Sequence, residues 1–193
     1  MDVYSVDVFE ILHFVFDYVL NDKIQKDNMM KTRGIRNNNP LNIRRSADRW
    51  VGARTEQTDK EFVQFDTMAY GYRAAWKTLQ SYYRRFCSLS QPFTVRTIIT
   101  RWAPPSENDT EAYIRNVLKL SGIGGRENLL PPENASGYHR ISRLVAAMTC
   151  VECGVSYSQV DLEAVYEGYK LAFPENVEEL EEMLLEEDEY SGW

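Results

Sequence analysis

The sequence contains few cysteine, proline and glycine residues. Its 193 residues include 3 Cys, 7 Pro and 10 Gly. Three cysteines cannot all pair, and a chain of this length folds without disulfide bonds, so Cys87, Cys150 and Cys153 are expected to be reduced thiols. The low proline and glycine content excludes a low-complexity chain. Hydrophobic residues make up 44% of the sequence, which supplies the core of one domain.

Long apolar runs are also missing. No uninterrupted run approaches the roughly 20 residues of a membrane-spanning helix, so no membrane span is expected. The first apolar stretch contains acidic residues, has no basic start and offers no small-residue cleavage site, which argues against a secretory signal. We therefore expect a soluble protein made in a cytoplasm, which something else must carry outward if it acts outside the cell.

Positive charge is scarce on average but not locally. The chain has 22 Lys and Arg against 29 Asp and Glu, a net charge of -7. Residues 175–189 hold nine acids and no base, whereas residues 30–148 hold 19 basic and 10 acidic residues. The basic middle of the chain can therefore bind an anionic partner, such as a wall polymer, a nucleic acid or an acidic protein. The acidic tail would repel such a partner.

Hydrophobic periodicity predicts a mainly α domain, an α+β fold with one small β-hairpin. An amphipathic helix is expected over 3–20. Met29 and Met30 follow it, so the native start could be Met1, Met29 or Met30, and segment 1–29 is set apart as a helix that is native only if translation begins at Met1. Residues 32–45 are rich in turn formers and predict an ordered loop. Residues 50–65 predict the hairpin.

The remaining chain predicts helices with recognisable ends. The expected N-caps are Asp66 or Thr67, Thr94, Asp109 or Thr110, and a Ser158–Asp161 capping box. Gly122 and Gly154 are expected to end two of these helices. The domain proper is placed at 30–174. The acidic tail, 175–193, is expected either to form a helix or to stay solvated.

Cys150 and Cys153 form a lone Cys-x-x-Cys on a predicted helix. Structural zinc would need two further ligands, and Cys87 with His139 is the only local supply. We interpret the two thiols as buried, and we expect no metal and no cofactor.

An ordered series of motifs lies between residues 33 and 120. Arg33-Gly-Ile-Arg-Asn-Asn-Asn-Pro40 opens it, Trp50-Val-Gly52 follows, and Arg101-Trp-Ala-Pro-Pro105 ends it with Glu107 and Asn108. The series resembles the lysozyme-like proteins of phages and prophages. More distantly, the order of parts is similar to the glucosaminidase-type peptidoglycan hydrolases. The resemblance covers about half the chain and implies a lysozyme-like fold, with glycan lying between the hairpin and the helices.

Glycan cleavage requires a protonated carboxylic acid and usually a second carboxylate. In the hydrolases the acid ends a helix upstream of the asparagine loop, but here Asp27 is the only carboxylate between Asp22 and Asn39. The same comparison implies that a hairpin acid, Glu61 or Glu56, is catalytic.

Glu107, in the turn after Pro105, is the third catalytic candidate. The alternative for Glu56 and Glu61 is that a hairpin acid is simply solvated. For Glu107 the alternative is that an acid near a helix N-terminus stabilises the helix dipole.

Amide, arginine and aromatic side chains around these motifs are predicted to bind the sugar chain. Amides offer both donor and acceptor to hydroxyl and N-acetyl groups, arginine pairs with carboxylates or phosphates, and aromatic rings stack on sugars. Alternatively, the asparagines bond the loop's own backbone and Trp102 belongs to the core. The predicted binding residues are Arg36, Asn38, Asn39, Asn42, Trp102, Asn108 and Tyr113.

Three functions follow from these observations. The first is a phage or prophage cell-wall-active glycosidase or lytic transglycosylase acting on peptidoglycan. The second is a non-catalytic virion or wall-binding protein that keeps the cleft, with wall glycan and other phage structural proteins as partners. The third, least favoured, is a nucleic-acid-binding protein. In the first two cases the protein is made in the bacterial cytoplasm and is virion-associated or released on lysis.

Overall fold

The computed structural model describes residues 32–191, with side chains described as far as Glu186. The helix predicted over 3–20 and the alternative starts at Met29 and Met30 lie outside these residues. The described chain is mainly helical, as predicted. None of its helices is long and apolar enough to cross a lipid bilayer.

Helix α3 (Met68–Ser88) is the longest helix in the described part of the chain. Thr67, one of the two caps predicted for this helix, accepts a hydrogen bond from the Tyr70 amide. Its apolar face recurs at the helical period and buries Trp76 completely. The Trp76 indole donates to the Val165 carbonyl of α7 (Leu162–Ala172) at 3.1 Å, so the helix pair is fixed by a polar bond as well as by packing.

A glycine allows α3 and α7 to approach each other. A Cβ atom added at Gly168 of α7 would lie 2.6 Å from the Cβ of Tyr72 and 3.0 Å from the Ala69 carbonyl oxygen. Only a residue without a side chain fits such a contact. Gly168 therefore lets the backbone of α7 lie directly against α3 at Ala69 and Tyr72.

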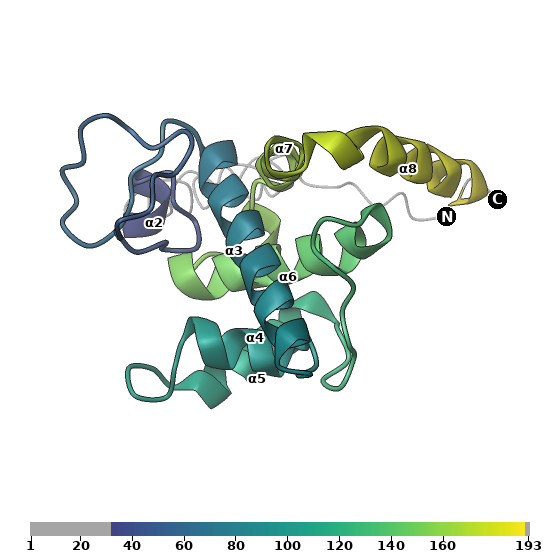
Figure 1. Ribbon diagram of the computed structural model, residues 1–193, viewed down its shortest axis with the longest axis horizontal. Helices are drawn as coiled ribbons and strands as arrows, with labels where there is room; N and C mark the ends of the chain where they lie inside the picture. The colour runs from purple at the N-terminus through teal and green to yellow at the C-terminus, as the bar shows by residue number, and fades with distance from the viewer. Residues whose placement is uncertain (1–31, 192–193) are drawn as a thin grey trace, which may run out of the picture.

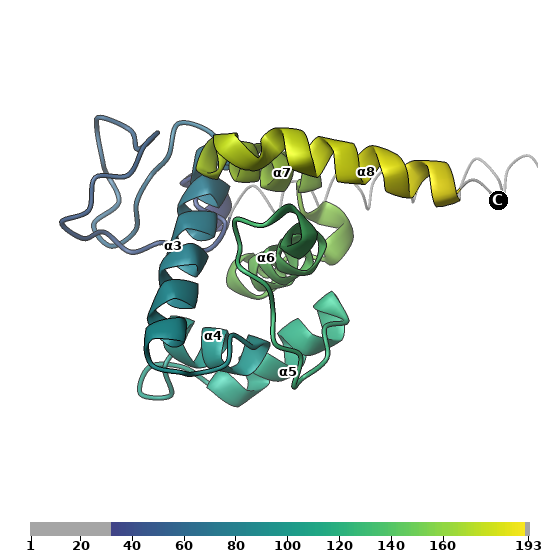
Figure 2. The same ribbon diagram turned by 45° about the vertical axis from the view of Figure 1, so that its right-hand side comes forward.

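Three further helices contribute to the core: α4 (Val95–Trp102), α5 (Thr110–Ser121) and α6 (Tyr138–Cys153). Thr94 caps α4 as predicted, and Asp109, one of the two caps predicted for α5, caps that helix. Gly122 and Gly154 end α5 and α6 as predicted, both in the left-handed conformation. Short 3-10 turns occupy Ala135–Gly137, Tyr157–Gln159 and Pro174–Asn176. Figures 1 and 2 show α3 running from α7 at one end to α4 and α5 at the other, with α6 between them.

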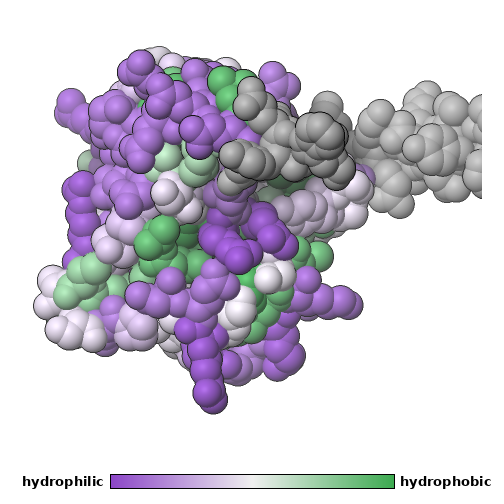
Figure 3. Space-filling model, turned by 90° about the vertical axis from the view of Figure 1, so that its right-hand side faces the viewer, coloured by the Kyte–Doolittle hydropathy of each residue, from purple (hydrophilic) through white to green (hydrophobic). Residues whose placement is uncertain are grey.

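The acidic tail forms a helix, α8 (Val177–Ser191), one of the two states expected for it. Leu180 on this helix is fully buried in the main hydrophobic cluster. The tail is therefore anchored to the domain at its first turns, and Figure 2 shows α8 extending along one edge of the molecule. The face in Figure 3 is mostly hydrophilic, with hydrophobic residues in small groups.

Three local expectations differ from the structure. The helix after Gly154 is capped by Asp161 alone, whereas the capping box forms between Ser156 and Gln159 of the preceding turn. The loop predicted over 32–45 begins with one helical turn, α2 (Arg33–Arg36). The strands of the small hairpin over 50–65 are not seen.

In the described chain, strand pairing is limited to two isolated bridges, Arg44 with Phe62 and Ala53 with Phe65. Between these two bridges, glutamine side chains form the hydrogen bonds that paired strands would otherwise form. The Gln64 carboxamide oxygen accepts from the Thr58 and Asp59 amides, and the Gln57 oxygen accepts from the Gln64 amide. The segment is thus ordered by side-chain bonds that a strand pattern does not encode.

Candidate functional site

A cleft of about 560 Å³ separates the irregular segment 42–62 from helices α3, α4 and α6. Its lining combines aromatic and acidic side chains, as a site for a polar ring compound would. The aromatic residues are Trp50, Phe62, Tyr82 and Trp102, and the acidic residues are Asp48, Glu107 and Glu152.

Glu152 is held by donors from three different parts of the chain. Its Oε1 accepts from the Trp102 indole at 3.0 Å and from the Tyr113 hydroxyl at 2.9 Å. Its Oε2 accepts from the Asn42 carboxamide at 2.9 Å. The carboxylate is therefore fixed in position at the cleft.

The local sequence explains why this carboxylate lies at the cleft. Glu152 is on the last turn of α6, and its neighbours Cys150 and Cys153 are buried. The Cys153 thiol donates to the Pro40 carbonyl at 3.3 Å, which packs the end of α6 against the asparagine loop. Asn42 has φ +50°, a left-handed conformation that asparagine tolerates.

Tyr113 is suited to hold Glu152 over a wide pH range. Burial raises the pKa of its hydroxyl well above the ordinary value, and the nearby charge of Glu152 raises it further. The hydroxyl stays protonated and continues to donate. Burial, and then the charge of Glu152, likewise raises the pKa of Cys153 to about 12, so this thiol is kept neutral.

Several predicted residues meet at this cleft. Asn42, Trp102 and Tyr113 all bond Glu152, and Glu107 and Asn108 line the same cavity. Trp102 packs against both hydrophobic clusters while its indole faces the carboxylate, so it belongs to the core and to the cleft together.

Glu107 is an exposed carboxylate of the cleft rim. It forms an ion pair with Arg44 at 3.3 Å, and both side chains are exposed. An exposed pair of this kind contributes little to stability. Glu107 is therefore available to a ligand once Arg44 turns away.

Asn38 and Asn39 bond the protein's own backbone. The Asn38 carboxamide donates to the Phe65 and Asp66 carbonyls at 3.0 Å. Asn39 is fully buried; its Nδ2 donates to the carbonyls of Ile43 and Val63, and its Oδ1 accepts from the Ile43 amide. In this structure the two asparagines order the wall of the cleft and do not line it.

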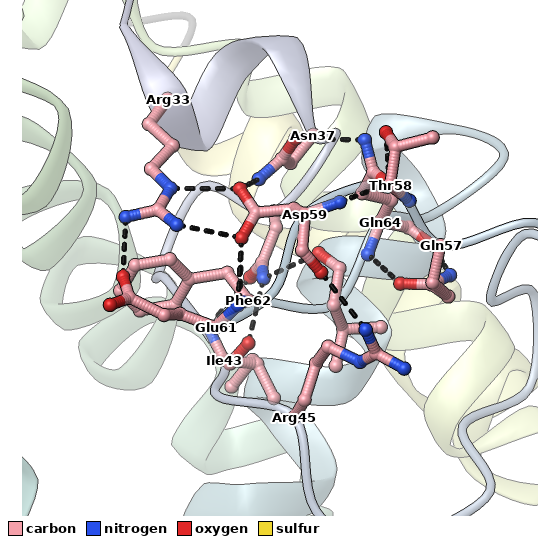
Figure 4. A network of polar contacts seen from close by, with 12 residues as sticks. Arg33, Asn37, Ile43, Arg45, Gln57, Thr58, Asp59, Glu61, Phe62 and Gln64 are labelled. Carbon is pink, nitrogen blue, oxygen red and sulfur yellow. Dashed lines mark hydrogen bonds and ion pairs between the residues drawn. The ribbon is translucent and has the colours of Figure 1, made fainter.

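Glu61 belongs to a separate ionic network, shown in Figure 4. Arg33 bonds Glu61 through Nη1 at 2.6 Å and bonds both oxygens of Asp59 through Nε and Nη2. The Asn37 carboxamide also donates to Asp59. The Arg33 guanidinium, with smaller contributions from backbone amides and Asn37, holds the pKa of Asp59 well below its usual range.

The other predicted residues lie away from the cleft. Glu56 and Arg36 are exposed, and neither lines the cavity that contains Glu152. Glu61 does not line it either. The catalytic role of Glu56 and Glu61 and the binding role of Arg36 stay predictions.

Sequence reasoning missed Glu152 itself, and with it the cleft residues Phe62 and Tyr82. One signal was present in the chain. Glu152 is the only charged residue between Leu144 and Cys153, a stretch that is otherwise suited to the core. A lone acid in such a stretch needs partners, because an unpaired buried charge is costly.

Comparison with known proteins gives one informative match. No family model matches the chain. Protein P5 of Pseudoalteromonas phage PM2 is 40% identical to it over 100 residues, which is 50% of this chain and 60% of the relative. The chain therefore spans about three fifths of that relative's length. The match supports a phage origin.

Proposed function

We propose that this protein is a phage-derived cell-wall-active enzyme, a glycosidase or lytic transglycosylase that acts on peptidoglycan glycan strands with Glu152 as its acid. The observation that carries the proposal is a carboxylate fixed by three side-chain donors in a cleft lined by aromatic rings. The resemblance of residues 33–120 to phage lysozyme-like proteins and the phage match support it.

The hydrogen bonds assign different tasks to the two oxygens of Glu152. A carboxylate oxygen offers two lone pairs, and both on Oε1 are used by Trp102 and Tyr113. Oε2 accepts a side-chain bond only from Asn42 among the described residues, so it keeps one site for a proton. Oε2 is thus the atom that would take up a proton from solvent and pass it to the glycosidic oxygen, which leaves Glu152 as a carboxylate again.

A second carboxylate would stabilise the positive sugar centre or activate water. Glu107 and Asp48 are the cleft residues able to do so. Glu107 pairs with Arg44, and Asp48 accepts from the Ser46 hydroxyl at 2.7 Å. A lytic transglycosylase needs no activated water, since a hydroxyl of the sugar itself closes the product, and Glu152 alone could then act first as acid and next as base.

The aromatic lining suits an amino-sugar chain. Trp50 and Tyr82 are half-buried and line the cleft beside Trp102. Flat faces of sugar rings pack on such rings, while hydroxyl and N-acetyl groups need polar partners. Asn42 and Asn108 supply amides in the same cavity.

Clearing of purified sacculi tests the proposal. Wild-type protein should lower the turbidity of a sacculus suspension, and Glu152→Gln should abolish clearing because the amide cannot donate an acidic proton. The substitution is nearly isosteric, and the Asn42 carboxamide can rotate to accept from the new amide. Glu61→Gln and Glu56→Gln test the alternative in which a hairpin acid is catalytic, and the present proposal expects both to clear like wild type. Glu163→Gln is the matched control, because Glu163 is exposed on α7 and does not line the cleft, and it should also clear like wild type. Inactivity of the wild type on walls of several chemotypes would defeat the enzymatic proposal.

A binding protein without catalysis is the second candidate, favoured by the pairing of Glu107 with Arg44. Such a protein would bind to insoluble peptidoglycan and would release no soluble fragment from it. Sedimentation of the protein with sacculi, followed by assay of the supernatant for sugars, distinguishes the two candidates.

A further inference from the structure

A smaller depression of about 250 Å³ lies next to the cleft that contains Glu152. Ser46, Asp48 and Trp50 line both cavities. A side branch on a polymer held in the cleft can therefore reach this depression past Trp50.

Three arginines, Arg45, Arg49 and Arg54, line the depression, against one carboxylate, Asp48. In the described part of the chain none of the three arginines forms an ion pair with an acid. Asp48 instead accepts from the Ser46 hydroxyl and its own amide bonds the same oxygen of Ser46. The depression thus carries a net positive charge beside an uncharged aromatic wall.

Two of the guanidinium groups are held in place by the backbone. Arg45 donates through Nη1 to the Asp59 carbonyl at 3.1 Å, and Arg54 donates through Nε to the Phe65 carbonyl at 2.9 Å. A guanidinium has five N–H donors, so each keeps several for a ligand. Arg49 is exposed, and its side chain makes no hydrogen bond among the described residues.

We propose that this arginine-lined depression (Arg45, Arg49 and Arg54) binds the carboxylate of a side branch on the wall glycan. Arginine recognises carboxylates through paired, charge-assisted hydrogen bonds. In peptidoglycan the carboxylate belongs either to the lactyl ether of the muramyl sugar or to the stem peptide attached to it. The inference rests on the proposed function, and it makes the protein selective for acidic wall glycan over neutral amino-sugar polymers such as chitin. A volume of about 250 Å³ fits a small acidic group, whereas a nucleic-acid duplex needs an extended basic surface.

Binding of three probes to the full chain tests the inference. The probes are soluble peptidoglycan strands with stem peptides, the same strands after amidase treatment, which exposes the lactyl carboxylate, and chitooligosaccharides, which carry no carboxylate. The protein is used as the Glu152→Gln variant, so that cleavage does not consume the probe. Both carboxylate-bearing probes should bind more tightly than chitooligosaccharide, and the tighter of the two identifies the carboxylate that is recognised.

Arg49→Ala should weaken binding of the carboxylate-bearing probes about tenfold. It should leave chitooligosaccharide binding unchanged. Arg49→Lys keeps the charge but loses the paired donors, so its affinity for the carboxylate-bearing probes should lie between that of the parent and that of Arg49→Ala. Arg115→Ala is the matched control, because Arg115 is exposed on α5 and lines neither cavity, and it should bind all probes like the parent.

Each other outcome is decisive. Equal affinity for the three probes, no binding of any, or equal losses in Arg49→Ala and Arg115→Ala would overturn the inference. Retention of duplex DNA that Arg49→Ala abolishes, with glycan binding unchanged, would overturn it in favour of nucleic acid. Selective binding without fragment release by the wild type would support the subsite and refute the enzymatic proposal. Cleavage with no preference among substrates would support the enzyme and refute the subsite.

Discussion

Replacing Asn39 by alanine should destabilise the protein far more than its short side chain suggests. The buried carboxamide is the partner of the Ile43 amide at 2.8 Å and of the Val63 carbonyl at 2.8 Å. The Ile43 carbonyl loses a bond as well but keeps one from the Val63 amide at 3.0 Å. Asn39→Ala therefore leaves two buried backbone groups without a partner.

The size of the loss follows from those two groups. Each unsatisfied buried group costs about 1–3 kcal/mol, so the free energy of unfolding should fall by about 2–6 kcal/mol. The loss is measured by urea denaturation, monitored by tryptophan fluorescence, as a lower midpoint of the unfolding transition. Asn108→Ala is the control, because Asn108 is exposed and the hydrogen bond of its side chain, to the Pro104 carbonyl, is long at 3.4 Å. The control should change stability by less than about 0.5 kcal/mol. A loss below about 1 kcal/mol for Asn39→Ala would refute the assignment of Asn39 as the support of the cleft wall.

Two further substitutions test packing and charge. Gly168→Ala should lower the free energy of unfolding by about 1–3 kcal/mol, because the added Cβ would collide with Tyr72. Gly124→Ala is the control and should have little effect, because the nearest atom to a Cβ there lies at 3.5 Å. Equal urea midpoints for the two variants would contradict this prediction. The lowered pKa of Asp59 means that the ionised form is favoured in the folded state, so its contribution to stability is present above the ordinary Asp pKa of about 3.9 and is lost as pH falls below it. Asp59→Asn should therefore unfold at lower urea than wild type at pH 7, with a gap that narrows below about pH 4; a gap independent of pH would contradict the Arg33–Asp59 pairing.

Helix ends were predictable because their determinants are local. Thr67, Thr94 and Asp109 cap helices through bonds to residues three positions away, which a sequence window contains. The structure of segment 50–65 was not predictable in the same way. Its alternating residues predicted two paired strands, but Gln57 and Gln64 bond the backbone groups that a strand ladder would have used. Alternation of residue types does not reveal that competition.

The asparagine loop was predicted to be ordered, but the partners of its side chains were not. Asn39 bonds Val63, which is 24 positions along the chain, and Asn42 bonds Glu152, which is 110 positions away. Residue type fixes which bonds an asparagine can make. Tertiary packing decides which of them order the wall and which face the cleft.

Glu152 shows the same limit for the site. Its donors Trp102 and Tyr113 are 50 and 39 positions away, and only the packing of α4 and α5 on α6 brings them to one carboxylate. The sequence supplied the three donors as candidates and offered Glu56, Glu61 and Glu107 as catalytic acids, of which only Glu107 lines the cleft. The position of a residue along the chain therefore does not reveal that a carboxylate from a later helix lies in the cleft.

The most direct test of the account is mass spectrometry of the soluble products released from purified sacculi by the wild type and by Glu152→Gln. The account predicts glycan fragments from the wild type, with either a reducing end or an anhydro end, and none from Glu152→Gln although both proteins sediment with the sacculi. Release of the same fragments by both proteins, or binding by both with no release, would contradict the role of Glu152 as the acid.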